Sequence, residues 1–162
     1  MTIQRELPVE LSEGVCQKCG DKREVFNLSG FLYGERLLLT EDGQCYVYLN
    51  CLDDTAFDEI NQILKSIIVD RKMSHDQETE YFYKIFGSTC DFVNKAKIDA
   101  TRTKVSCLSC GSDEISVNEK FPPDVIRVTL PVITHSAWDS MDEQMKKRII
   151  INEFKERCAI SS

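Results

Sequence analysis

The sequence predicts an α+β fold formed by a single domain that spans residues 1–162. Three features indicate it: a hairpin motif, segments with helical apolar spacing, and two copies of a Cys-x-x-Cys-Gly motif that lie far apart in the chain. The chain has 162 residues, of which 42% are hydrophobic and 29% charged. This length and composition are typical of a soluble globular protein that buries a core of its own.

The segment RLLLTEDGQCYVYLN predicts a β-hairpin, because an Asp-Gly pair at 42–43 separates two runs rich in strand-forming residues. A two-residue turn at this pair would place Leu38 opposite Val47 on one face and Leu37 opposite Tyr48 on the other. Both faces are largely apolar, so we expect the hairpin to be covered on both sides.

Two helices are expected after this hairpin. The first starts at 53–55, where two aspartates and a threonine are suitable N-caps, and its apolar residues recur with helical spacing. That apolar stripe consists of Phe57, Ile60, Leu64, Ile67 and Ile68. The second helix is expected to start after Ser74, with Gln77 completing a capping box, and to end at Gly87. The pattern at 88–97 does not decide between a renewed helix and a loop.

Two short strands and one further helix are expected in the C-terminal part of the chain. Segments 114–119 and 124–132 have strand-like patterns. Ser140 and Glu143 form a capping box, which predicts the start of an amphipathic helix. Its apolar ridges consist of Met141, Met145, Ile149, Ile150, Phe154 and Cys158. The second strand and this helix make up a C-terminal unit at 124–160.

The two Cys-x-x-Cys-Gly motifs predict one structural zinc site. They cover 16–20 and 107–111, and we call each of these five-residue turns a knuckle. Zinc prefers four nitrogen or sulfur ligands in a tetrahedron, and a tight Cys-x-x-Cys turn supplies two of them. The glycine after each pair permits the positive φ that lets backbone amides point at the sulfurs. The expected ligands are Cys16, Cys19, Cys107 and Cys110, and four thiolates leave no coordination position open for a substrate.

Other roles are open to these cysteines. Each pair is compatible with a redox-active dithiol, although turn and strand residues follow it where thioredoxin-like motifs open a helix. Two disulfides would require an oxidising compartment. The two pairs also fit separate metal sites. A single zinc ion bound by all four sulfurs is the interpretation that we prefer.

The two knuckles resemble those of a zinc ribbon, in which each knuckle lies at the tip of a β-hairpin and the two hold one metal ion. The resemblance covers 14–28 and 102–120. It departs from the compact pattern in its spacing, because 87 residues separate Cys19 from Cys107 where ~15 to 20 are usual. The hairpin and the two helices at 36–98 are therefore expected to be inserted between the knuckles, so that the metal closes a long loop and its binding is coupled to folding.

The remaining cysteines and the histidines are expected to have no catalytic role. The four cysteines are Cys45, Cys51, Cys90 and Cys158, and a free cysteine is often buried as a small hydrophobe. A second metal site that includes His75 or His135 is the alternative. A thiol enzyme would need one of these cysteines beside a base. We find no nucleophile elbow, no phosphate-binding glycine loop and no His/carboxylate metal motif, and therefore expect a protein that is not an enzyme.

The charge of the chain is acidic. The formal net charge is −7, and one zinc ion with four thiolates would bring it to about −9. A chain of this charge is repelled by phosphate backbones unless a local basic patch overrides the field, which argues against nucleic acid as a partner. No apolar stretch approaches the ~18 to 20 residues that cross a bilayer, and the first residues lack the apolar core of a signal peptide. We therefore expect a cytoplasmic protein without membrane contact.

An acidic run between the knuckles predicts a binding surface. From 37 to 64 the chain has six acidic residues and no Lys or Arg. The residues expected to contact a basic partner protein are Asp53, Asp54, Asp58 and Glu59. The alternative is that these carboxylates favour a helix N-terminus and otherwise lie on a solvated surface.

These features favour a non-catalytic, zinc-stabilised protein that binds another protein. In size and charge the chain is similar to bacterial toxin-immunity proteins, a resemblance of composition that implies an acidic face placed in the basic cleft of a nuclease toxin. The alternative function is a nucleic-acid-associated zinc-ribbon factor in transcription or RNA handling. That alternative depends on a basic segment before the second knuckle, which contains Lys95, Lys97, Arg102 and Lys104.

Overall fold

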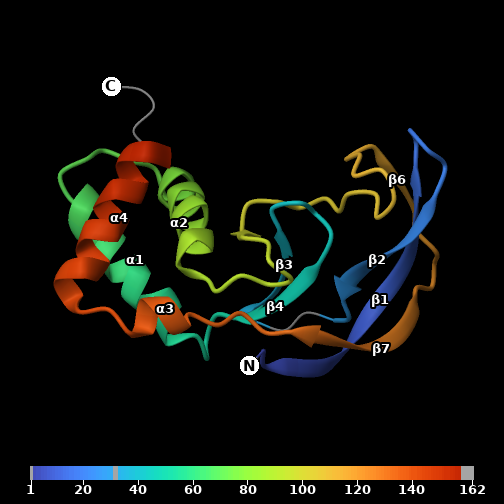
Figure 1. The fold of residues 1–162 in the computed structure, drawn as a ribbon, viewed down its shortest axis with the longest axis horizontal. Helices are drawn as coiled ribbons and strands as arrows, with labels where there is room; N and C mark the ends of the chain where they lie inside the picture. The colour runs from blue at the N-terminus through green and yellow to red at the C-terminus, as the bar shows by residue number, and fades with distance from the viewer. Residues whose placement is uncertain (1, 31–32, 158–162) are drawn as a thin grey trace.

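The computed structural model describes residues 2–30 and 33–157 and has a mixed α+β architecture with two antiparallel sheets (Figure 1). The first sheet consists of β1 (Gln4–Cys16), β2 (Lys22–Leu28), β6 (Ile115–Asn118) and β7 (Asp124–Pro131). The second consists of β3 (Glu35–Thr40), β4 (Tyr46–Asn50) and β5 (Ile98–Asp99). The helices are α1 (Thr55–Ile68), α2 (His75–Thr89), α3 (Ser136–Asp139) and α4 (Glu143–Arg157). The helices gather at one end of the molecule and the first sheet at the other, with the second sheet between them.

Strand β1 is the centre of the first sheet. It pairs with β2 along one edge, and with β6 and β7 in succession along the other. The register places Cys16 opposite Ile115 at one end of β1 and Gln4 opposite Pro131 at the other. The strands expected at 114–119 and 124–132 are therefore confirmed, and both lie antiparallel to β1.

The β3–β4 hairpin has the predicted register, with Leu38 opposite Val47 and Leu37 opposite Tyr48. A parallel bridge between Tyr48 and Val132 joins this hairpin to the chain that leaves β7. The hairpin therefore connects the first sheet with the helical part of the molecule.

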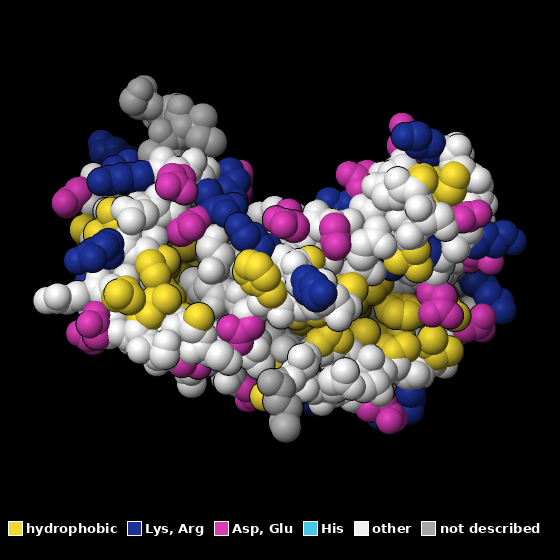
Figure 2. Space-filling model, in the orientation of Figure 1, with side chains coloured by type: hydrophobic (Ala, Val, Ile, Leu, Met, Phe, Trp, Pro, Cys, Tyr) yellow, Lys and Arg dark blue, Asp and Glu magenta, His cyan; other side chains and the backbone are white. Residues whose placement is uncertain are grey.

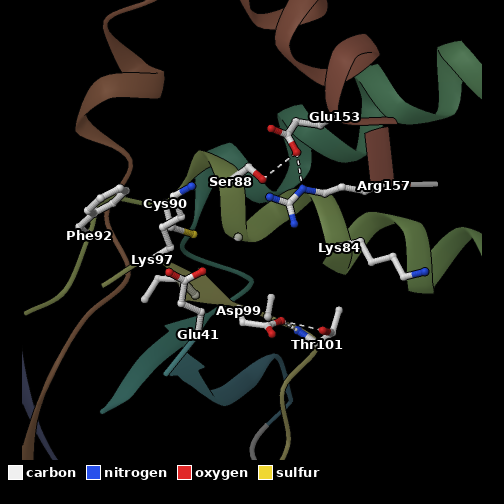
Figure 3. Close-up of a pocket in the computed structure, with 13 residues that line it drawn as sticks. Glu41, Lys84, Ser88, Cys90, Phe92, Lys97, Asp99, Thr101, Glu153 and Arg157 are labelled. Carbon is white, nitrogen blue, oxygen red and sulfur yellow. Dashed lines mark hydrogen bonds and ion pairs between the residues drawn. The ribbon is translucent and has the colours of Figure 1, made fainter. Parts of the chain in front are cut away.

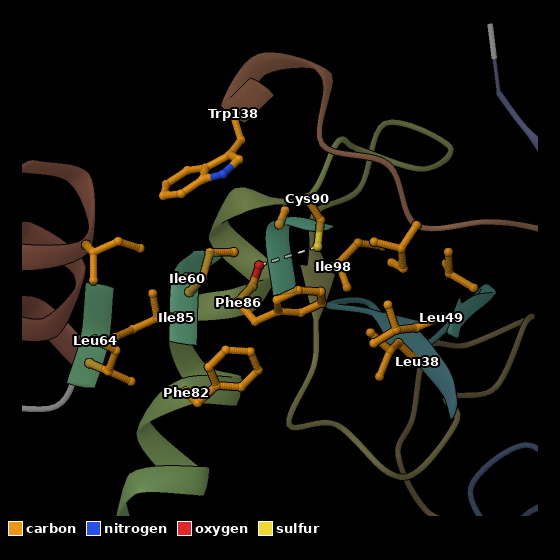
Figure 4. Packing of buried hydrophobic residues seen from close by; sticks show 14 of the residues in the cluster. Leu38, Leu49, Ile60, Leu64, Phe82, Ile85, Phe86, Cys90, Ile98 and Trp138 are labelled. Carbon is orange, nitrogen blue, oxygen red and sulfur yellow. Dashed lines mark hydrogen bonds between the residues drawn. The ribbon is translucent and has the colours of Figure 1, made fainter. Parts of the chain in front are cut away.

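Two hydrophobic clusters lie against opposite faces of the hairpin, as its two apolar faces predict. The larger cluster joins the hairpin to the helices and includes Leu38, Val47, Leu49, Ile60, Leu64, Ile85, Phe86, Trp138, Ile150 and Phe154 (Figure 4). The smaller cluster joins the hairpin to the first sheet and consists of Leu7, Val9, Tyr48 and Leu130, with partly buried neighbours. Because successive strand residues point to opposite faces, one hairpin supplies side chains to both clusters.

The caps of α1 and α2 agree with the sequence pattern, but the predicted end of α2 is wrong. Asp54 Oδ1 accepts a hydrogen bond from the amide of Phe57, and the capping box of Ser74 and Gln77 is complete. Helix α2 continues through Gly87 to Thr89. This glycine serves a close approach, because a Cβ at position 87 would lie 2.4 Å from the carbonyl oxygen of Ile98.

The capping box predicted for the last helix is also wrong. Helix α4 begins at Glu143, and its first turn is capped by Asp142, whose Oδ1 accepts the amide of Met145 at 2.8 Å. Ser140 instead ends α3, and its hydroxyl donates to the carbonyl of Ala137. The buried residues of α4 are Ile150 and Phe154, whereas the predicted ridge residue Met145 is exposed. The prediction for Cys158 lies outside the described residues.

Substitution of Gly87 by alanine tests the contact between α2 and β5. We expect Gly87→Ala to lower the free energy of unfolding by about 1 to 3 kcal/mol, although alanine is the better helix former, because the added methyl group overlaps the Ile98 carbonyl. Urea unfolding followed by circular dichroism measures this. Thr79→Ala, at an exposed position of the same helix, is the control and should change stability by about 0.5 kcal/mol or less. Equal stability of Gly87→Ala and wild type would contradict the packing described here.

Candidate metal centre

The two knuckles lie at the same end of the first sheet and have the same backbone conformation. The first joins β1 to β2, and the second precedes β6, which pairs with β1 beside the first knuckle. In each knuckle the glycine amide donates to the carbonyl of the first cysteine. The distance is 2.8 Å from Gly20 N to Cys16 O and 3.0 Å from Gly111 N to Cys107 O. The glycine φ angles are +81° and +76°, a region that residues with a side chain rarely adopt.

The four predicted cysteines come together across the two knuckles. Cys16 Sγ lies 3.6 Å from Cys110 Sγ, and Cys19 Sγ lies 3.5 Å from Cys107 Sγ. All four sulfurs lie within 4.8 Å of one another. Zn–S bonds of about 2.3 Å in a tetrahedron place the sulfurs about 3.8 Å apart, so this cluster has the dimensions to hold one metal ion. The pairs run between the knuckles and are far longer than a disulfide bond of about 2.0 Å.

The surroundings of the two buried sulfurs, those of Cys16 and Cys107, favour thiolates. The amide of Cys19 donates to Cys16 Sγ at 3.5 Å, and this hydrogen bond is the largest of several that together lower the pKa of Cys16 to about 6. The equivalent amide, that of Cys110, lowers the pKa of Cys107. The amide of Asp21 lowers the pKa of Cys19, but the hydrogen bonds that its sulfur shares with Cys107 and the other knuckle thiols raise that pKa to about 12. Cys16 and Cys107 are buried, whereas Cys19 and Cys110 are exposed, so each knuckle contributes one buried and one exposed cysteine. Four cysteine thiolates in this arrangement would hold a divalent ion such as zinc.

The turn of the β3–β4 hairpin is hydrogen-bonded to the second knuckle. Gln44 Nε2 donates to the carbonyl of Cys107 at 3.0 Å, and the amide of Ser106 donates to the carbonyl of Gly43 at 3.0 Å. From β2, Arg23 Nη1 donates to the carbonyls of Ser106 and Gly43 at 2.6 and 3.3 Å. The cysteine cluster is therefore connected to the hairpin that both hydrophobic clusters share.

The other described cysteines do not join the cluster. Cys90 is buried near the end of α2, its sulfur donates to the carbonyl of Phe86, and burial raises its pKa. Burial also raises the pKa of the half-buried Cys51. Cys45 accepts a hydrogen bond from Asn94 Nδ2 at 3.1 Å. In the part of the chain that the structure describes, three or more side chains that could bind a metal ion come together only at the four knuckle cysteines. Neither His75 nor His135 therefore belongs to a metal-binding group of described residues.

A cavity of about 250 Å³ between α2, α4 and β5 includes Cys90 in its wall (Figure 3). Its charged side chains have both signs, and some of them interact within the wall: Glu153 accepts from Ser88 and pairs with Arg157, and Asp99 accepts from Thr101. A thiol whose pKa is raised is a weak nucleophile at neutral pH.

The structure separates the four acidic residues that the sequence predicts as a partner surface. Asp53 and Asp58 are exposed, although Asp53 Oδ2 accepts a hydrogen bond from Asn50 Nδ2 at 3.0 Å. Asp54 and Glu59 bind residues that lie far away in the sequence. Glu59 accepts hydrogen bonds from Lys146 Nζ at 2.7 Å and from Trp138 Nε1 at 3.3 Å. Asp54 caps α1 and also lies 2.7 Å from His135 Nε2, and both of these side chains are nearly fully buried.

His135 has the hydrogen-bond partners of a charged imidazolium. Its Nε2 faces the Asp54 carboxylate, and its Nδ1 lies 3.1 Å from the carbonyl oxygen of Thr89. Both partners are acceptors, so both ring nitrogens must carry a proton for both bonds to form. Burial alone would lower the pKa of His135, but the hydrogen bond and the charge of Asp54 raise it above its ordinary value. This pair ties the start of α1 to the end of α2 and to the segment that precedes α3.

A cavity of about 540 Å³ opens beside this ion pair. Three aspartates line it, Asp53, Asp54 and Asp139, and Arg5 is its one basic residue besides His135. The guanidinium of Arg5 lies 4.9 Å from the centre of the Tyr48 ring. The exposed carboxylates of Asp53 and Asp139 therefore give the mouth of this cavity an acidic character.

The basic segment before the second knuckle is only partly available to a ligand. Arg102 pairs with Asp113 and donates to Ser106 Oγ. Lys95, Lys97 and Lys104 are its remaining cations, and all three are exposed.

Comparison with protein-family models, with curated proteins and with solved structures found no match to this chain. None of the helices in the described part of the chain is both long enough and apolar enough to span a bilayer.

Loss of one knuckle sulfur is expected to release the metal and destabilise the fold. Purified wild-type protein should contain one zinc ion per chain by elemental analysis, and its cobalt-substituted form should show the absorption of a tetrahedral thiolate site. Cys107→Ser should lose the metal and about 3 to 5 kcal/mol of unfolding free energy, the scale expected for opening a long crosslinked loop.

Cys45→Ser is the control for this experiment, because Cys45 lies outside the four-sulfur cluster. It should retain one zinc ion and the cobalt spectrum. Wild-type protein without metal, with all four knuckle thiols open to alkylation, would contradict the assignment of the site.

Stability should depend on pH through the buried pair of Asp54 and His135. Because the pKa of His135 is raised in the folded state, the pair stabilises fully below the unfolded pKa of about 6.5, and the contribution is lost as pH rises through the folded pKa. Asp54→Asn keeps a good N-cap and removes the charge. It should lower the free energy of unfolding at pH 6 by about 1.5 to 3 kcal/mol, and by less as pH rises.

Urea unfolding at pH 6 to 9 measures this difference between wild type and Asp54→Asn. His135→Gln should give the same convergence towards high pH, and the double variant should add little to either single variant. A difference that stays constant across the pH range would show that His135 is neutral in the folded protein.

Proposed function

We propose that this chain is a non-catalytic protein-binding protein whose fold is held by one structural zinc ion in a ribbon-type centre. The observation that carries this proposal is the cluster of four cysteine sulfurs within 4.8 Å at the end of an antiparallel sheet. A metal with four thiolate ligands has no open position for water or substrate, so its role is structural.

The zinc-ribbon assignment is supported by the two knuckles and their strands. The first knuckle is the turn of the β1–β2 hairpin, and the second leads directly into β6 on the opposite edge of β1. The shared pattern of glycine amides and positive φ angles makes the two turns equivalent around the proposed metal. The centre departs from the compact ribbon because 87 residues separate its two halves.

The binding role is supported by the acidic surface beside α1. Asp53 and Asp58 are exposed and near the N-terminal end of this helix, and Asp53 also lines the cavity of about 540 Å³. A cavity with exposed carboxylates at its mouth would receive a lysine or arginine side chain of a basic partner. We propose that this partner is a basic protein, and that a nuclease toxin neutralised by this chain is the kind of partner that fits.

The first test is to isolate the native protein and identify the metal and the co-purifying molecules together by mass spectrometry. We expect one zinc ion and a defined basic protein whose association resists nuclease treatment. Co-purified DNA or RNA that is lost at raised salt would instead support a nucleic-acid-associated zinc-ribbon factor.

Charge reversal at the exposed aspartates tests the proposed surface. The double variant Asp53→Lys/Asp58→Lys should bind the isolated partner at least about tenfold more weakly in calorimetry, because it replaces attraction by repulsion. The control Asp70→Lys/Glu156→Lys makes the same change of charge at two exposed positions, one just after α1 and one near the C-terminal end of α4. It should alter the affinity about twofold or less. Equal affinities of the two double variants would remove this surface from the proposal.

A further inference from the structure

A groove between the two sheets is lined by two neighbouring strands that do not pair with each other. Strands β2 and β3 follow one another in the chain, and both line a cavity of about 380 Å³. Its apolar wall includes Val25, Phe26, Leu28, Leu37, Tyr46, Val105, Ile115 and Val117. Figure 2 shows hydrophobic side chains at the surface in the part of the molecule where β2 and the hairpin lie.

The edge of β3 that faces this groove is open at Leu37. Leu38 and Val47 of β4 form a hydrogen-bonded pair of this antiparallel hairpin. The N–H and C=O groups of the neighbouring Leu37 and Leu39 therefore point to the opposite edge of β3. There β5 pairs with Leu39 and Thr40 and then ends. The chain turns away at once, since the amide of Arg102 donates to the carbonyl of Asp99. Within the described residues, Leu37 therefore has no strand partner on this side.

The edge of β2 that faces the groove is open as well. β1 covers one edge of β2, and no strand in the described ranges pairs with the other. The register with β1 directs the backbone groups of Phe26 and Leu28 to that free edge. The amide of Phe26 donates to the hydroxyl of Tyr46 at 3.0 Å, so a side chain already takes one of these positions. Open strand edges over an apolar floor are the elements that an added strand uses.

The charged residues that line the groove are all basic, in a chain whose net charge is −7. They are Arg36, Arg102 and Lys104. Arg36 lies over the ring of Tyr83 and Arg102 pairs with Asp113, whereas Lys104 is exposed and has no ion pair among the described residues. An occupant that brings a carboxylate beside Lys104 is therefore complementary in charge to this groove.

We propose that the groove between β2 and β3 binds an extended peptide segment of a partner protein, with alternating apolar and acidic residues, by strand addition. Its backbone pairs with the open edge at Leu37 or at Leu28, its apolar side chains contact the floor, and a carboxylate faces Lys104. A polyanionic nucleic acid fits less well, because the net charge of the chain repels it and it offers no backbone to pair with a strand edge. This surface is separate from the acidic surface at Asp53 and Asp58 and selects the opposite charge.

The test uses the metal-loaded full chain and a blocked, fluorescently labelled peptide of alternating valine and glutamate. Anisotropy should show saturable binding, and a peptide with lysine in place of glutamate should bind at least about tenfold more weakly. Amide hydrogen exchange followed by NMR should slow at Leu37 or Leu28 by at least about tenfold when the acidic peptide is bound.

Two charge variants locate the carboxylate. Lys104→Glu should weaken binding of the acidic peptide at least about fivefold, whereas Lys72→Glu, the same change at an exposed lysine after α1, should leave it within about twofold. Equal binding of the two peptides, or protection confined to amides elsewhere, would overturn the proposal. It would also be overturned if an oligothymidylate displaced the peptide, or if the edges proved to be covered by a second copy of the chain in solution.

Discussion

The approach of four sulfurs at one end of the first sheet is the contact on which the arrangement of the chain depends. It joins the turn after β1 to the turn before β6, and all of the hairpin, α1 and α2 lies between these two points. Four thiolates this close repel one another unless a cation lies between them. A divalent metal bound by the four sulfurs would remove that repulsion and close a loop of 87 residues, so that its binding free energy would be part of the folding free energy.

The β3–β4 hairpin transmits this constraint to the rest of the molecule. At its turn, the side chain of Gln44 binds the carbonyl of Cys107, and the carbonyl of Gly43 accepts the amide of Ser106. Along its length, one face packs on the helices and the other on the first sheet. A hairpin buried on both faces cannot change its register without moving apolar side chains out of both clusters. The hairpin therefore couples the end of the molecule that holds the four cysteines to the end that holds the helices. Its turn contacts the second knuckle, and its apolar face contacts the helices.

Local sequence rules predicted the elements whose determinants lie within a few residues. The capping box at Ser74 and the knuckle glycines each act over one turn, and the structure has the expected conformation at both. The Asp-Gly pair at 42–43 gives the expected hairpin register, but the connection is longer than a two-residue turn, because Thr40 binds the amide of Gly43 and the carbonyl of Cys45. The failures occur where a distant contact decides. Helix α2 passes through Gly87 because β5 packs against it, and α3 forms where Asp91 accepts the amide of Ser136 at 2.8 Å from 45 residues away. Nothing in the local pattern marks such partners.

The acidic run shows how a single compositional signal divides into different physical roles. Asp54 and Glu59 have their partners in His135 and Lys146, which lie 81 and 87 residues later in the chain, and no spacing rule connects them. A buried carboxylate must be paired because an unpaired charge is costly to remove from water. An exposed carboxylate such as that of Asp58 needs no partner within the protein. Its electrostatic field extends into the solvent, where it can attract a positively charged partner. The acidic surface open to a partner is thus smaller than the run implies, and Asp54 and Glu59 instead bind other elements of the helical part of the molecule that carries that surface.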